Sequence, residues 1–380
     1  MRERLVTIIM FLLMPLTLTG CWDTNHIVDQ RIISGVGLDL EQNNNIVGTV
    51  RALRLESKGA GQFKLQDELV QSSGKSLLEI GVKLDNMLAG KTVGNKTHII
   101  IINEQLAKQG IYEPLEYFYR NSKSYIGSKV IISLEPAVRI LSVDKLEKSP
   151  ISFDILQTIK GAERSTTIPV QSLYTLWSKM LDTSRDTILP LIRMKQSENL
   201  ILDSIALFHG DRFTGETITG EDSTLLLLLM NELSKTAIIN VEIEPIRSNN
   251  QHEESTKEII SFNTMSMKRN MQVTVDEASQ AITCSIKVHL YVEIVHYPYI
   301  SGVEKEKEKL SKAIATSLNR KAEAITKKLL KANCDVFGIE GQMSAFHPKR
   351  SNRMDWDEEY RNIQIKPEFI VHINGSGLLK

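Results

Sequence analysis

Cysteine, net charge and long apolar runs are all scarce in this sequence. Three cysteines among 380 residues exclude a scaffold built on disulfide bonds. Basic and acidic residues both number 46, so a general polybasic grip on nucleic acid or lipid is not expected. Residues 5–18 are apolar and uncharged, but this run is shorter than the roughly 20 residues that a membrane-spanning helix needs.

Motifs that carry chemistry are also missing. The eight histidines are scattered and none forms HExxH, and no GxSxG nucleophile elbow occurs. The glycine pair at 35–37 lacks the third glycine of a dinucleotide loop, and SGKS at 73–76 lacks the earlier glycine of a phosphate loop. The sequence therefore assigns no catalytic residue, no cofactor-binding residue and no metal ligand, and it predicts that the protein is not an enzyme and needs no cofactor.

What the chain does have begins at its amino terminus. Arg2 and Arg4 precede the apolar run at 5–18, and the small residues Thr19 and Gly20 then stand before Cys21. This order resembles the lipobox of bacterial lipoprotein precursors, in which the cysteine thiol receives a diacylglyceryl group and the chain is cut before it. Two acyl chains anchor a protein stably. The alternatives are an ordinary secretory signal that contains a cysteine and a short uncleaved anchor.

The remaining composition is that of a globular protein. Hydrophobic residues make up 42% and charged residues 24% of the chain, which is long enough for two or three domains with real cores. In the amino-terminal part, β-rich runs at 31–40 and 46–55 predict a hairpin, and the polar stretch 56–68 predicts a mobile loop. Apolar residues at helical spacing then predict one buried helix face, formed by Leu77, Ile80, Leu84, Met87 and Leu88.

Strands and helices alternate further along the chain. Residues 97–103 form a short apolar run typical of a fully buried strand, and helices are expected at 151–159 and 170–181. A hairpin is predicted around the turn Gly210–Asp211. The leucine run at 224–233 is too short to span a membrane and indicates a buried helix.

The carboxyl-terminal part has the clearest periodicity. Apolar and polar residues alternate from Ile282 to Ile294, which predicts a strand with one buried face, and 303–331 reads as a long amphipathic helix. A further strand is expected at 362–377. Cys284 falls on the buried strand face, so we expect an inert thiol and no disulfide bond with Cys334.

These patterns predict an α+β fold with three mixed α/β domains, the carboxyl-terminal one an antiparallel sheet with a long amphipathic helix. The expected boundaries are 1–20 for a signal peptide, 21–30 for a tether, 31–148 for the N-terminal domain, 149–238 for the middle domain and 239–380 for the C-terminal domain. The residues alone thus indicate a lipid-anchored exported binding or scaffolding protein.

Several segments together resemble a known family. GCWD at 20–23 and RIISGVGLDL at 31–40 are similar to the start of the Ger(x)C lipoproteins, the C subunits of nutrient germinant receptors. The similarity continues through 74–84, 97–111, 117–125, 205–217 and 334–348 in the family's order. By position, Cys21 is the lipidated residue, and the family signature comprises Trp22, Asp23, Gly35, Gly37 and Asp39. The chain departs from the family around His26 and at Cys334, positions without an assigned role.

The resemblance implies a function in spore germination. It implies a lipoprotein carrying fatty acyl chains such as palmitate on Cys21 and held on the outer surface of the spore inner membrane. It also implies two integral-membrane partners, an A-type and a permease-like B-type subunit, with which the protein assembles and signals. A lipid-anchored solute-binding protein of a transporter is the first alternative, and a lipid-anchored hydrolase is a weaker one.

Overall fold

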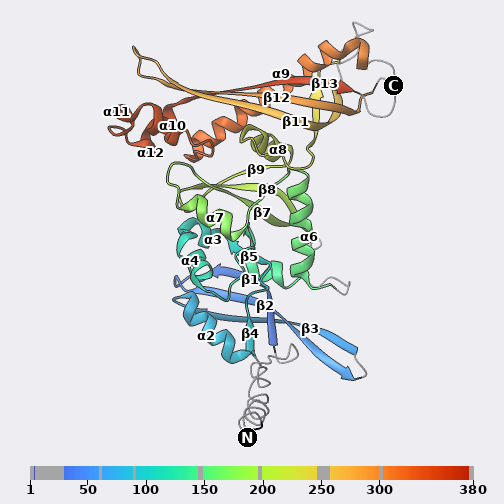
Figure 1. Cartoon of the computed structure of the whole chain (residues 1–380), viewed down its shortest axis with the longest axis vertical. Coiled ribbons are helices and arrows are strands. Elements are labelled where there is room, and N and C mark those ends of the chain that lie inside the picture. Colours follow the sequence, from blue (N-terminus) through green and yellow to red (C-terminus); the bar gives the residue numbers. More distant parts are fainter. Residues whose placement is uncertain are drawn as a thin grey trace.

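A computed structural model describes residues 30–59, 62–88, 91–143, 149–195, 199–245, 257–298 and 303–375, with Arg4 alone before them. The predicted signal peptide and tether therefore lie outside the described residues, apart from Arg4 and Gln30. The protein is elongated (Figure 1). Helix α2 (Leu77–Met87) and strand β4 (Lys91–Val93) lie at one end, and a separate sheet that contains β11 (Glu258–Val275), β12 (Ile282–His296) and β13 (Gln364–Gly375) lies at the other.

A nine-stranded sheet forms the larger part of the molecule. Its order is β3-β2-β1-β5-β6-β7-β8-β9, and the short strand β4 pairs with β1 off this path. The strands are β1 (Gln30–Leu40), β2 (Ile46–Gly59), β3 (Gln62–Gly74), β4 (Lys91–Val93), β5 (Ile99–Asn103), β6 (Lys129–Ser133), β7 (Ile188–Lys195), β8 (Asn199–His209) and β9 (Arg212–Thr219). Pairing is parallel from β1 through β5 and β6 to β7, and antiparallel at both flanks. Parallel central strands are buried on both faces, which explains the continuous isoleucine run of β5.

Helices cover both faces of this sheet. Helices α2 (Leu77–Met87), α3 (Glu104–Gln109), α4 (Tyr112–Arg120) and α7 (Leu173–Met180) contribute to one apolar core with β1, β2, β5 and β6. Helices α5 (Ala137–Leu141) and α6 (Ile151–Arg164) form a second core on the opposite face. The two cores share the sheet as a common wall.

The second sheet has the order β10-β11-β12-β13. Its strands are β10 (Ile238–Ile243), β11 (Glu258–Val275), β12 (Ile282–His296) and β13 (Gln364–Gly375), and the long helix α9 (Val303–Ala332) packs against it. The predicted α+β class is confirmed. One strand pair differs from the predicted antiparallel sheet: β13 runs parallel to β12, because α9 crosses back along the sheet between them. The short helices α10 (Ile339–Phe346), α11 (Pro348–Ser351), α12 (Trp356–Glu359) and η4 (Tyr360–Asn362) fill the rest of this connection.

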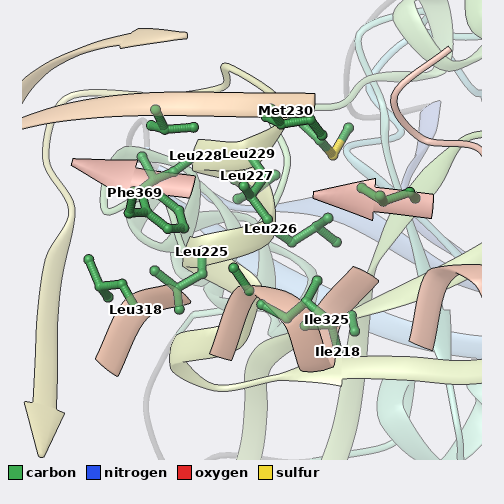
Figure 2. Packing of buried hydrophobic residues seen from close by; sticks show 14 of the residues in the cluster. Ile218, Leu225, Leu226, Leu227, Leu228, Leu229, Met230, Leu318, Ile325 and Phe369 are labelled. Carbon is green, nitrogen blue, oxygen red and sulfur yellow. The ribbon is translucent and has the colours of Figure 1, made fainter. Parts of the chain in front are cut away.

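Helix α8 (Glu221–Leu229) lies between the two sheets and is buried on all sides. Leu225 to Leu229 are each at most 1% exposed, as expected for an apolar run with no polar face. Figure 2 shows these leucines gathered with Leu318 and Ile325 of α9 and Phe369 of β13, and all of them belong to one apolar core. The predicted buried helix is confirmed, and it joins the two sheets through a continuous core.

Two expectations about the amino-terminal part are wrong. Residues 56–59 and 62–68 do not form a loop but continue β2 and β3, which pair along this stretch, for example Leu55 with Leu65. Polar side chains are compatible with a strand whose faces are both partly exposed, so the polar composition of this stretch wrongly indicated a loop. Met87 does not belong to the buried face of α2, because its side chain is 59% exposed.

Strands of the predicted N-terminal and middle domains share one sheet, because Ile132 and Ser133 of β6 pair with Leu191 and Ile192 of β7. The division into three domains with the expected boundaries stays a prediction.

Candidate functional site

The signature residues divide into two groups. Cys21, Trp22 and Asp23 lie outside the described residues. Gly35, Gly37 and Asp39 lie on β1, at every second position, so all three face the same side of the sheet. This is the side covered by α5 and α6.

The two signature glycines allow helix α5 to approach the strand. A Cβ atom on Gly37 would come within 2.9 Å of the Ala137 Cβ and 3.0 Å of a Leu141 methyl carbon. A Cβ on Gly35 would lie 3.2–3.3 Å from side-chain atoms of Ile99 and Leu141 and of Ser152 in α6. A Cβ at Gly37 would therefore force α5 to shift, and one at Gly35 would require its neighbours to give by a few tenths of an ångström.

Asp39 completes the same contact. Its two carboxylate oxygens accept hydrogen bonds from the backbone N–H groups of Ala137 at 2.6 Å and Val138 at 3.1 Å. Pro136, the residue before α5, provides no capping side chain, so Asp39 caps this helix from another element. Burial raises the pKa of Asp39, and the two hydrogen bonds partly oppose that rise. Gly35, Gly37 and Asp39 thus hold helix α5 against strand β1.

A second constellation lies at the turn between β8 and β9. Gly210 adopts φ 57°, and its N–H donates to Asp186 Oδ1 at 2.7 Å. The Asp211 carbonyl accepts from the Ile111 N–H at 2.9 Å, and the Asp211 carboxylate accepts from the Tyr112 N–H at 3.3 Å. The predicted hairpin turn therefore joins the start of α4 to the segment that precedes β7.

The turn after α9 docks on the same segment. Asp335 N–H donates to Asp186 Oδ2 at 2.7 Å, and Asp186 N–H donates to the Asp335 carbonyl at 3.0 Å. The Asp335 carboxylate accepts from the N–H groups of Ile339 and Glu340 and so caps α10. Burial raises the pKa of Asp335 to about 6, with the hydrogen bonds opposing the rise.

His209 adds an ionic contact at this point. Its Nε2 lies 3.2 Å from Asp357 Oδ1 of α12, and its Nδ1 lies 3.5 Å from Asp186 Oδ2. The Asp186 carboxylate is the main cause that raises the pKa of His209 to about 8, against the effect of partial burial. We call Asp186, His209, Gly210, Asp211 and Asp335 the junction. It connects three segments that resemble the family, namely 97–111, 205–217 and 334–348.

An apolar cavity of about 310 Å³ lies on the other side of β1, beneath α2. Its apolar walls include Ile33, Val36, Val50, Ile80, Leu84 and Phe118. Leu78 and Val82 of α2 also line it and are 65% and 54% exposed, so they stand at the opening. Asn121, Lys123 and Ser124 bring polar groups to the same cavity. Its volume lies at the lower end of the range for small-molecule sites.

The two described cysteines are free and buried, as expected from the sequence. Burial raises the pKa of Cys284 to about 12 and raises that of Cys334 as well. Thiols in this state are weak nucleophiles at neutral pH. Among the residues that the structure describes, no three histidine, cysteine or acidic side chains gather closely enough to hold a metal ion, and no helix is both long and apolar enough to cross a membrane.

Sequence reasoning found some of these residues and missed others. It singled out Gly35, Gly37 and Asp39 and the turn at Gly210, and the structure places the first three together. It missed Asp186 and the reciprocal hydrogen bonds of Asp186 with Asp335, because 149 residues separate the two aspartates. It also missed the cavity, which depends on how α2 and α4 pack and leaves no local signal.

The fold and these segments define a class of protein. Residues 23–194 match the model of the spore germination protein N-terminal domain, and residues 203–377 match the C-terminal model of spore germination B3/GerAC-like proteins. The chain belongs to this family of spore germination proteins, and the membership predicted from its motifs is confirmed.

Individual relatives agree along the whole chain. Spore germination protein GerQC of Bacillus cereus is 21% identical over 374 residues, which cover 97% of this chain and 98% of the relative. Spore germination protein KC of Bacillus subtilis strain 168 is 21% identical over 408 residues, covering 98% and 96% of the two chains. The crystal structure of the GerBC protein has the same fold, with a TM-score of 0.55 at 12% identity, over 93% of this chain and all of the other.

Proposed function

We propose that the protein is the C subunit of a nutrient germinant receptor, held on the outer surface of the spore inner membrane by a diacylglyceryl group on Cys21. Its partners are two integral-membrane subunits, one of A type and one permease-like subunit of B type. The observation that carries the proposal is the family match over both halves of the chain, together with the lipobox-like order that ends at Cys21.

Within the receptor, the protein serves assembly and signalling and is neither an enzyme nor the reader of the nutrient. Its best-placed buried carboxylates are occupied structurally, since Asp39 caps α5 and Asp335 caps α10. The junction ties the first sheet to the C-terminal part of the chain through Asp186 and Asp335. This link supports a signalling role in which a partner bound at one end of the molecule affects the structure at the other end.

The short tether favours assembly at the membrane. Eight residues lie between Cys21 and Gln30, the first residue of β1, so even a fully extended chain of nine residue steps reaches about 32 Å. An anchored folded body would therefore stay close to the bilayer. Tethering raises the effective concentration of neighbouring membrane proteins, so a weak interface suffices for a stable complex.

The proposed lipid anchor on Cys21 is tested by measuring the intact mass of the protein. The protein extracted from spore membranes should begin at Cys21 and carry a diacylglyceryl adduct. Cys21→Ala should lose the adduct, leave the membrane fraction and weaken germination through its receptor. An unmodified Cys21 in the wild-type protein would contradict the anchor.

The role in the receptor is tested by exchange. Deletion should abolish the response to every nutrient of the receptor, and a close relative that still assembles should restore it with unchanged nutrient preference. Germination against a nutrient panel measures both. A preference that follows the exchanged subunit would contradict the proposed role.

The apolar cavity is the observation that favours the solute-binding alternative. If it served nutrient capture, the full-length protein would bind a nutrient of its receptor at physiological concentration by calorimetry. Leu84→Phe, which fills the cavity, would then abolish that binding, whereas Met87→Phe on the far side of α2 would not. We expect no nutrient binding by either variant or by the wild-type protein.

A further inference from the structure

The cavity beneath α2 lies next to the point where the tether leaves the folded body. Arg31 of β1 pairs with Thr92 of β4, and Thr92 lines the cavity. Paired strands are about 4.8 Å apart, so the start of the first strand lies one strand spacing from the cavity wall. Figure 1 shows β4 and α2 together at the end of the molecule away from the C-terminal sheet.

The walls of the cavity suit a hydrocarbon chain. They are formed by aliphatic and aromatic side chains of the first sheet and of α2 and α4, and the core residues among them are less than 10% exposed. A methylene chain inside would shield the apolar walls of the cavity from water and give these side chains additional van der Waals contacts. Polar side chains such as Asp85, Asn121 and Lys123 also line the cavity, but the apolar residues of the lining outnumber them.

The opening of the cavity suits the end of such a chain. Leu78 and Val82 are exposed apolar residues one helical turn apart, and both line the cavity. Asn121, Lys123 and Ser124 lie in the same lining and offer hydrogen-bond donors. The ester oxygens that join an acyl chain to glycerol accept such bonds. Apolar walls that also carry hydrogen-bond donors therefore match a fatty acyl ester.

We propose that the cavity beneath α2 binds one fatty acyl chain of the lipid on Cys21 of the same molecule. This inference rests on the proposed lipid anchor. The tether argues for the chain's own lipid as the source, because nine residue steps keep Cys21 within about 32 Å of Gln30. The occupied cavity draws α2 toward the bilayer and fixes the orientation of the first sheet over it.

The experiment uses the full-length protein in membranes of a bacterium that processes lipoproteins. The cells are fed a fatty acid that carries a photoactivatable diazirine, and irradiated protein is digested and mapped by mass spectrometry. Cross-links between the lipid of Cys21 and peptides of α2, α4 or β1 in the same molecule support the proposal. Labelled Cys21 with cross-links to phospholipid alone overturns it and leaves the anchor intact. Cys21 without label overturns both the anchor and this inference.

Further experiments test where the cavity opens and which lipid supplies the bound acyl chain. Leu78→Asp and Val82→Asp place a charge where the chain enters and should lower the cross-link yield about tenfold, the ratio that 1.4 kcal/mol produces. Met87→Asp is the matched control, because Met87 is similarly exposed on α2 but does not line the cavity. Equal loss in all three variants overturns the assignment of the opening. Labelled phospholipid that links to the cavity of the wild-type protein as strongly as the Cys21 lipid does would overturn the proposed source.

Discussion

The two faces of strand β1 are packed in opposite ways. On one face, Gly35 and Gly37 let α5 and α6 approach so closely that a single added carbon would collide. On the other face, Val36 and other large apolar residues line a cavity of about 310 Å³ beneath α2. The same strand therefore carries a rigid docking contact and a loose one. This teaches that the two glycines mark the face on which helices must pack closely, whereas Val36 between them lies on the face that borders the cavity.

The largest effect is expected when a leucine is replaced by alanine on each side of strand β1. Leu141 is fully buried against both glycines, whereas Leu84 lines the cavity. We expect Leu141→Ala to lower the free energy of unfolding by about 3–5 kcal/mol and Leu84→Ala by about 2 kcal/mol, because Leu84 has fewer neighbours to lose. Urea denaturation measures both. Equal losses would mean that the two faces are packed alike.

The next test adds one carbon at a glycine. Gly37→Ala should lower the free energy of unfolding by about 1–3 kcal/mol, because the new Cβ meets Ala137 and Leu141. Gly161→Ala in α6 is the control, since its Cβ would meet no atom within 4 Å. Alanine is preferred in a helix, so this control should gain up to about 1 kcal/mol. Thermal unfolding in which Gly37→Ala is neutral would refute the docking role of the signature.

A smaller change in the free energy of unfolding is expected at the junction, where His209 makes ionic contacts. The pKa of His209 is raised to about 8 beside Asp186 and Asp357, with Asp335 and Glu340 also near Asp186. A raised pKa means that the stabilisation is complete below about pH 6.5 and is lost as pH rises through about 8. The His209 side chain is 40% exposed, so solvent screening limits the effect to about 1 kcal/mol.

The measurement for His209 is the free energy of unfolding at about pH 6 and about pH 9, for the wild-type protein and for His209→Gln. The difference between the two proteins should shrink at the higher pH. His98 provides a comparison, because burial lowers its pKa and it should show the opposite trend. A constant difference between wild type and His209→Gln would argue against a charged His209 in the junction.

The smallest expected effect fills space on the cavity side. Val50→Ile adds one methylene to the wall and should raise the free energy of unfolding by about 0.5–1 kcal/mol. The matching change on the other face, Ala137→Val, should lower it, because Ala137 already touches β1 at Gly37. Thermal unfolding measures both changes in the free energy of unfolding. Changes of opposite sign would support the difference in packing between the two faces of β1, and changes of the same sign would contradict it.

The elements predicted best from the sequence were those with strong periodicity. Strict alternation over 282–294 and fourfold spacing over 303–331 correspond to β12 and α9. In contrast, the polar stretch 56–68 shows no apolar alternation, although its residues 56–59 and 62–68 continue β2 and β3. A strand whose two faces are both partly exposed carries no burial pattern from which it could be recognised.

The site was predictable only in part for a related reason. Glycine and aspartate at alternate positions of β1 could be named from the motif, but their task depends on α5, about 100 residues later. The reciprocal bonds of Asp186 with Asp335 and the parallel pairing of β13 likewise depend on contacts between distant segments. Local periodicity reports which side of an element is buried and not what buries it.

The parallel pairing of β13 with β12 also bears on how the protein is made. Phe369 of β13 belongs to the core around α8, and β13 follows α9 and every other described strand in chain order. While the chain emerges amino terminus first, β12 and α9 are complete before this strand exists. The apolar side of the second sheet is therefore not fully covered until the last strand has been synthesised. A premature stop before residue 364 would leave that side exposed to chaperones and proteases.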